Sequence, residues 1–152
     1  MVAGMALTAC GDDDKPVEIN LALAKTALAI SADELEPTDI TVTASGGDWT
    51  VASNVEWIKA QKVDNETLRV SCQANNKPEP RKGMVTASIG EVSGTINVTQ
   101  DGAQITLSKT ALSVPADEPE PTDIAVTASG GDWTVASNVE WIRAEKVDNE
   151  TL

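Results

Sequence analysis

A twelve-residue stretch that occurs twice is the feature that most constrains the fold. Residues 46–57 read Gly-Gly-Asp-Trp-Thr-Val-Ala-Ser-Asn-Val-Glu-Trp, and the same letters return at residues 130–141. Extending the comparison outward pairs residues 21–68 with residues 105–152, and 38 of these 48 positions are identical. A period of 84 residues has the size of a domain. We therefore expect one module and part of a second.

The first module is expected over residues 19–102, and apolar and polar residues alternate along it with a period of two. Turn signals follow every eight to twelve residues, and no helical period occurs. We expect the longest irregular segment over residues 75–83 and a turn over residues 90–94. Seven or eight short strands in about 83 residues predict an all-β fold, an immunoglobulin-like antiparallel β-sandwich.

The second module is expected over residues 103–152 as a tandem repeat whose second copy is truncated. Its last residue, Leu152, pairs with Leu68 of the first copy. No later residue corresponds to the strands that complete the first module, so we expect the sequence to be a fragment of a longer reading frame.

The N-terminus resembles that of a bacterial lipoprotein. Residues 1–9 are apolar or small, and they end in Leu-Thr-Ala immediately before Cys10, which resembles a lipobox. The resemblance implies a partial signal peptide at residues 1–9 and acylation of Cys10; a buried strand with a free thiol is the alternative. Residues 10–18 then read as the lipidated cysteine and an acidic tether. An acidic run in this place resembles the export signal of Bacteroidetes surface lipoproteins, which implies a lipid anchor in the outer membrane, on the cell surface.

The composition excludes several functions. The formal net charge of −13 would repel nucleic acid and an anionic membrane face, so neither is an expected partner apart from the lipid anchor. Histidine is absent, which disfavours catalytic triads and transition-metal sites. The acidic pairs Asp33/Glu34 and Asp64/Glu66 lack the spacing of a calcium loop. We expect no enzyme activity, no cofactor and no metal.

Two of the four tryptophans are expected in the core. A sandwich without Phe or Tyr needs indole rings inside, and Trp49 shares its strand face with Val51. Trp133 is its counterpart in the second copy. We therefore predict that Trp49 and Trp133 are core residues, and the inward period likewise places Cys72 inside as a small buried hydrophobe.

The other two tryptophans are candidates for contact with a glycan. Saccharide binding commonly uses an aromatic face beside polar groups. Trp57 is bordered by Glu56 and Lys59, and Trp141 is its counterpart. Burial in the core is the competing interpretation for Trp57.

Several short motifs together resemble the BACON family, whose name stands for Bacteroidetes-associated carbohydrate-binding, often N-terminal. They are a Trp-x-Val strand, a second Trp followed by Ile, an Asn-Asn and Arg-Lys-Gly loop, and a closing Val-Thr-Gln-Asp-Gly at residues 98–102. The resemblance covers about residues 20–102 fully and 104–152 in part. It implies a surface module that binds polysaccharide or a mucin-type glycan, or a spacer that projects a partner domain, which here would be a further C-terminal domain. A module for protein adhesion or assembly is the alternative.

Overall fold

The computed structural model describes residues 16–117 and 120–152. The predicted signal peptide, Cys10 and most of the acidic tether lie outside the described residues. The described chain is built from strands: β1 (Asn20–Leu23), β2 (Ala27–Ile30), β3 (Thr38–Ser45), β4 (Thr50–Ser53), β5 (Ile58–Lys62), β6 (Thr67–Cys72), β7 (Arg81–Ile89), β8 (Val92–Gln100), β9 (Gln104–Leu107) and β10 (Val126–Ser129). Across the residues so described, no helix is long and apolar enough to cross a membrane.

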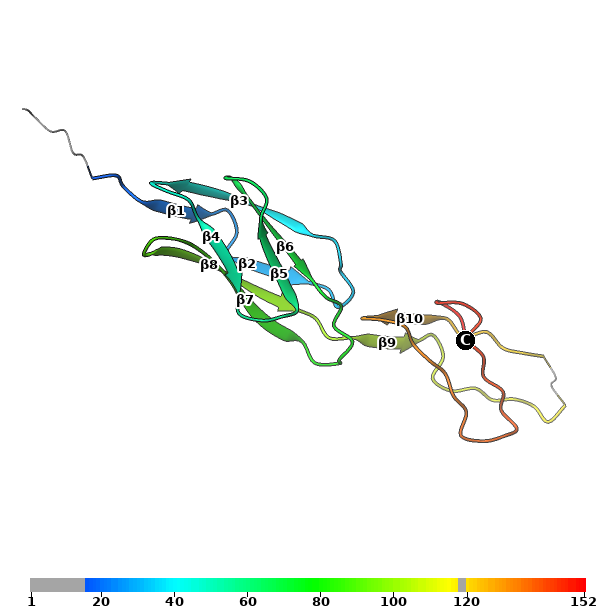
Figure 1. Cartoon of the computed structure of the whole chain (residues 1–152). Helices are drawn as coiled ribbons and strands as arrows, with labels where there is room; N and C mark the ends of the chain where they lie inside the picture. The colour runs from blue at the N-terminus through cyan, green and yellow to red at the C-terminus, as the bar shows by residue number, and fades with distance from the viewer. Residues whose placement is uncertain (1–15, 118–119) are drawn as a thin grey trace, which may run out of the picture.

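The first eight strands form two facing sheets (Figure 1). One sheet has the order β1-β3-β6-β5 and the other the order β2-β8-β7-β4. With β1, β3, β6 and β5 in the places of strands A, B, E and D, and β4, β7 and β8 in those of C, F and G, this is an immunoglobulin-type arrangement. The predicted immunoglobulin-like β-sandwich is therefore confirmed.

One strand pair departs from the antiparallel pattern that the sequence predicted. β2 pairs with β8 in parallel, with Ala27 opposite Asn97 and Ile30 opposite Gln100. The reason lies in the connection: β1 pairs with β3 in one sheet, and β2 continues in the same direction into the other sheet. There it lies beside β8, which runs the same way. All other strand pairs of the described chain are antiparallel.

The core lies between the two sheets, where the inward residues of each strand meet. Alternate positions along each strand are buried, as in β2, β3 and β6. The buried cluster consists of Leu28, Ile30, Ile40, Val42, Trp49, Ile58, Leu68, Val70, Cys72, Val85, Ala87, Ile89, Ile96 and Val98. Burial of one such aliphatic side chain contributes about 1.5–3 kcal/mol. Trp49 is the one aromatic ring in this cluster.

The loop predicted over residues 75–83 is shorter than expected. β7 already begins at Arg81, and Gly83 is part of its ladder with β8. An added Cβ at Gly83 would lie 2.5 Å from Ile58 Cδ1 and 2.6 Å from Val55 Cγ2. This glycine therefore permits close packing inside a strand and does not mark a turn.

The turn predicted over residues 90–94 is also shorter than expected, because strand pairing extends into the predicted segment. β7 and β8 pair as far as Ile89 opposite Val92, so only two residues form the turn. Gly94 lies within β8, where an added Cβ would be 3.0 Å from Leu23 Cδ1. A side chain on β1 occupies that space.

Residues 103–152 do not form a second sandwich in the described chain. Their strands, β10 and β9, make a two-stranded sheet, and an isolated bridge joins Ala125 to Thr151. Local contacts nevertheless recur 84 positions later. Val126 N donates to Glu150 O at 2.7 Å, as Val42 N donates to Glu66 O at 2.8 Å in the first module.

The chain enters the sandwich at one pole and leaves it at the other. Ile19, just before β1, lies beside Gly90, just before β8, and we call this end the N-terminal pole. β8 ends at Gln100, opposite Ile30 and Arg81, and this end is the C-terminal pole. β9 follows directly beyond it (Figure 1). The nine residues of β8 span about 30 Å between the poles.

Candidate functional site

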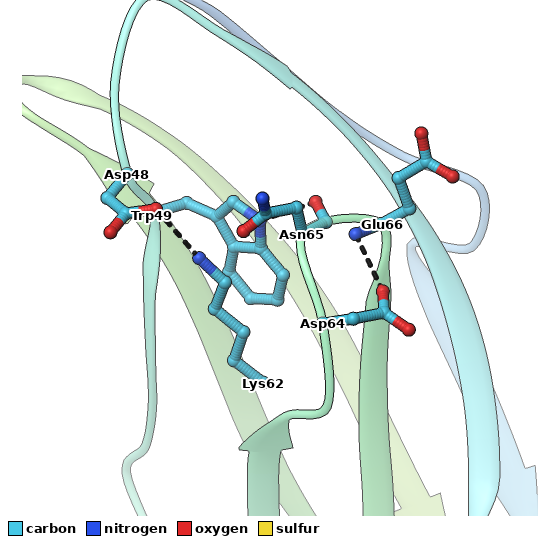
Figure 2. A network of polar contacts seen from close by, with 6 residues as sticks. All are labelled: Asp48, Trp49, Lys62, Asp64, Asn65 and Glu66. Atoms are coloured by element: carbon cyan, nitrogen blue, oxygen red, sulfur yellow. Dashed lines mark hydrogen bonds and ion pairs between the residues drawn. The ribbon is translucent and has the colours of Figure 1, made fainter.

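Trp49 is held at the N-terminal pole with its indole inside the sandwich. The preceding turn contains Gly46 at φ 89°, a conformation that favours glycine. The Trp49 side chain is 3% exposed, and Nε1 donates to Asn65 O at 2.9 Å. Figure 2 shows Lys62 reaching across the indole toward Asp48. Lys62 Nζ lies 4.9 Å from the ring centroid and 3.0 Å from Asp48 Oδ1. The ring therefore has no face left for a ligand.

Asp64 has a structural role in the neighbouring turn. Its Oδ1 accepts a hydrogen bond from Glu66 N at 2.8 Å (Figure 2). This bond, with a second from the Thr67 hydroxyl, lowers the pKa of Asp64 below its ordinary value. The carboxylate thus closes a turn of the Asx type. Within the part of the chain that the structure describes, no group of three or more acidic or cysteine side chains could hold a metal ion.

Trp57 lies at the C-terminal pole, in the turn before β5, and is half-buried against the core. The Arg81 guanidinium stacks on its ring, 4.3 Å from the centroid. An added Cβ at Gly83 would lie 3.1 Å from Trp57 Cζ2, so strand β7 also packs closely against the ring. The arginine occupies the position that a sugar would need on that face.

The Arg81 side chain is itself fixed by a buried polar cluster. Arg81 Nε donates to Gln100 Oε1 at 2.9 Å, and Nη2 donates to Gln73 O at 2.6 Å. Gln100 is fully buried, and its Nε2 lies within 3.2 Å of the carbonyl oxygens of Ser31 and Ala32 and 3.1 Å from that of Gln73. All polar groups of the side chain are paired, which is the condition for burying an amide.

The sequence analysis missed this cluster, although a signal for it was present. Ile96 and Val98 face inward, and the period of two places Gln100 on the same face. A polar residue at an inward position predicts hydrogen-bond partners inside the fold. The partners themselves come from distant segments and could not be read from the local pattern.

Glu56 and Lys59 lie together but apart from the ring of Trp57. They border a shallow surface depression of about 420 Å³, and the indole is not among its lining residues. The lining residues are Ser53, Asn54, Val55, Glu56, Ile58, Lys59 and Ala60. The predicted glycan site is thus divided: its charged residues share a surface, and its aromatic ring stacks with Arg81 elsewhere.

The comparison with known families covers this same sandwich. Residues 47–101 match the BACON family model, described as "Putative binding domain, N-terminal". Because this match covers most of the first module, we refer to residues 19–102 as the BACON domain. The matched residues run from the turn before Trp49 to the residue after Gln100, so they include the rings and the polar cluster. The family description thus names a binding domain without naming a ligand. No curated protein matches the chain.

Trp133 differs from its counterpart in the BACON domain. Its Nε1 donates to Asn149 O at 2.9 Å, and Lys146 Nζ lies 4.8 Å from its ring centroid, as at Trp49. The side chain is nevertheless only half-buried and is not part of the core cluster, which corrects the prediction that Trp133 is a core residue. The reason is that nothing within residues 103–152 corresponds to β7 and β8, which cover Trp49 in the BACON domain.

Trp141 is the most exposed of the tryptophans, at 80%. In the BACON domain, Arg81 and Gly83 cover the equivalent ring of Trp57. The described chain has no counterpart of these two residues beside Trp141. Its exposure therefore follows from the missing cover, and it supplies no evidence for a ligand by itself.

Cys72 faces the core of the BACON domain, as its inward period predicted. The side chain is 8% exposed, and the thiol is free. Burial raises the pKa of Cys72, and the positive charge of Arg81 opposes this shift in part. A protonated, buried thiol behaves as a small apolar group.

Proposed function

We propose that the BACON domain is a non-catalytic spacer in a lipid-anchored surface protein. The observation that carries this proposal is the placement of its ends: the chain enters at the N-terminal pole and leaves at the C-terminal pole (Figure 1). A domain connected in this way adds its full length, about 30 Å, to the distance between an anchor and whatever follows.

The burial and stacking of the two indole rings favour a spacer function rather than sugar binding by these rings. Trp49 is buried beneath Lys62, and Trp57 is stacked by Arg81. Trp49 has no exposed face, and Arg81 occupies a face of Trp57 of the kind that carbohydrate stacking uses.

The spacer is tested by the height of the chain above a membrane. The full chain is anchored through an acyl group at Cys10, and a dye at residue 152 reports its distance from dye-labelled lipid by energy transfer. Deletion of residues 19–102 should lower the dye by about 30 Å. A flexible Gly-Ser segment of equal length serves as the control, because it should give a broad range of distances reaching the membrane. An unchanged height after deletion would contradict the proposal.

A second candidate function is glycan binding at the depression beside Glu56 and Lys59. The family description as a binding domain favours it, and Glu56 and Lys59 border the same shallow depression. A carboxylate and an ammonium group there would hydrogen-bond sugar hydroxyls without an aromatic ring.

A glycan array with the full chain tests this candidate. Binding should be present in the unsubstituted chain and lost in Glu56→Ala and Lys59→Ala. Both residues are exposed, so neither change should unfold the domain. Glu140→Ala and Arg143→Ala, at the equivalent positions of the second copy, are matched controls. Glycan binding that survives both first-copy changes would place the site elsewhere.

A further inference from the structure

The connection between the BACON domain and the following segment is unusually close. Gly102 is buried against the loop at the C-terminal pole, and an added Cβ would overlap the carbonyl group of Pro78. Ala103 N donates a hydrogen bond to Lys77 O at 2.7 Å. The linker at residues 102–103 is therefore packed and hydrogen-bonded against the domain that precedes it.

A second contact comes from the turn after β10. Gly130, at φ 88°, is buried, and an added Cβ would overlap Asn75 O and lie 2.6 Å from Ala103 Cβ. Gly131, the next residue, has φ 141° and nothing within 4 Å of an added Cβ. Only the first glycine of this turn is pressed against the BACON domain.

The loop that receives the turn is rigid. Asn75 is 1% exposed, and its Nδ2 donates to Glu79 O and to Asp101 O, each at 2.9 Å. Its backbone N donates to Ala32 O at 2.7 Å, and its Oδ1 accepts from Lys77 N at 3.3 Å. Each polar group of the Asn75 side chain thus forms a hydrogen bond that stabilises the conformation of the loop at residues 75–80.

We propose that residues 75–80 are a docking surface for the Gly-Gly turn at residues 130–131, and that this contact fixes the orientation of the following segment. The partner that fits is a turn tip whose first residue is glycine, because any side chain at that position would displace Asn75 or Ala103. The inference deepens the proposed spacer: a chain of modules joined in this way is a stiff rod, whereas a free linker would let successive modules swing.

The same tip exists at the N-terminal pole. An added Cβ at Gly46, the counterpart of Gly130, would lie 3.0 Å from Ile19 Cα and 3.1 Å from Glu18 O. These residues precede β1 as Gly102 and Ala103 precede β9. The BACON domain therefore carries the tip at one pole and the receiving loop at the other, as a repeating junction requires.

The orientation depends on these glycine contacts and not on a broad apolar interface. An open groove of about 650 Å³ lies at the junction, and residues of both parts line it, among them Asn76, Gln104 and Trp133. The side chains that border this groove are therefore not packed against one another across it.

Distance measurements between spin labels test the junction. The full chain carries labels at two exposed strand positions, Thr41→Cys in β3 and Thr106→Cys in β9, with Cys10 and Cys72 replaced by serine and alanine. We expect a single narrow distance distribution. A broad distribution in this otherwise unsubstituted chain would overturn the proposal, whatever the membrane-height experiment gives.

Two glycine variants supply the matched pair. Gly130→Ala should lose the narrow distribution, whereas Gly131→Ala should keep it, although both place a side chain at positive φ. The indole N–H signal of Trp133, bonded to Asn149, reports whether the segment stays folded. A narrow distribution in folded Gly130→Ala would overturn the proposal. If that variant unfolds the segment, protection of the Ala103 amide from hydrogen exchange in the unsubstituted chain decides, and rapid exchange there would refute docking.

Discussion

Replacing Trp49 with alanine should remove a large part of the stability of the BACON domain. A buried tryptophan withdraws about 150–250 Å² from water, which corresponds to about 4–6 kcal/mol as an upper bound. Substitutions of this kind cost about 3–5 kcal/mol. Loss of the bond from Nε1 to Asn65 O adds little, because that carbonyl lies on an exposed residue and can bind water. We therefore expect a loss of about 4 kcal/mol from a total of roughly 5–15 kcal/mol.

Urea unfolding of the full chain, followed by far-ultraviolet circular dichroism, measures this loss. Trp133→Ala is the matched control, since Trp133 makes the same indole bond and the same lysine contact outside the core. It should leave the main transition unchanged. Trp49→Phe keeps a buried ring and should cost less than Trp49→Ala. A loss below about 1 kcal/mol for Trp49→Ala would refute the assignment of Trp49 to the core.

Three further results are expected. Gln100→Leu should destabilise the BACON domain by about 1–3 kcal/mol in the same urea assay, because Arg81 Nε loses its acceptor and the carbonyl groups of Ser31, Ala32 and Gln73 each lose one hydrogen bond. Gly83→Ala should cost about 1–3 kcal/mol, since its Cβ has no room inside β7; unchanged stability would mean that the neighbouring side chains move freely. The raised pKa of Cys72 contributes stability that is present below the ordinary thiol pKa and lost as pH rises through the folded value. The urea midpoint should therefore fall at alkaline pH in the natural chain and fall less in Cys72→Ala.

The strands of the sandwich and the burial of Trp49 were predictable because they follow from local patterns. A period of two fixes which side chains face the core, whatever lies opposite. Glycine was less informative: Gly83 and Gly94 resemble turn residues in sequence, but both lie inside strands against bulky neighbours. Only the neighbours, which come from other strands, distinguish the two uses.

The environment of Trp57 could not be predicted for a related reason. Its flanking residues, Glu56 and Lys59, suggested a binding rim, yet the residue that decides the state of the ring is Arg81 on another sheet. Trp133 shows which of its properties depend on the local sequence and which depend on distant strands. An identical local sequence gives an identical indole bond, but burial needs the facing sheet, which residues 103–152 do not supply.

Nuclear magnetic resonance of the indole N–H groups tests most directly whether the rings of the BACON domain hold the fold or bind a ligand. The full chain, labelled with nitrogen-15, is titrated with a panel of polysaccharides and mucin-type glycans. We predict that the Trp49 and Trp57 signals stay in place at every concentration, because Lys62 and Arg81 cover the two rings. A saturable shift of the Trp57 signal, with the Trp49 signal unmoved and the domain still folded, would contradict a structural role for that ring.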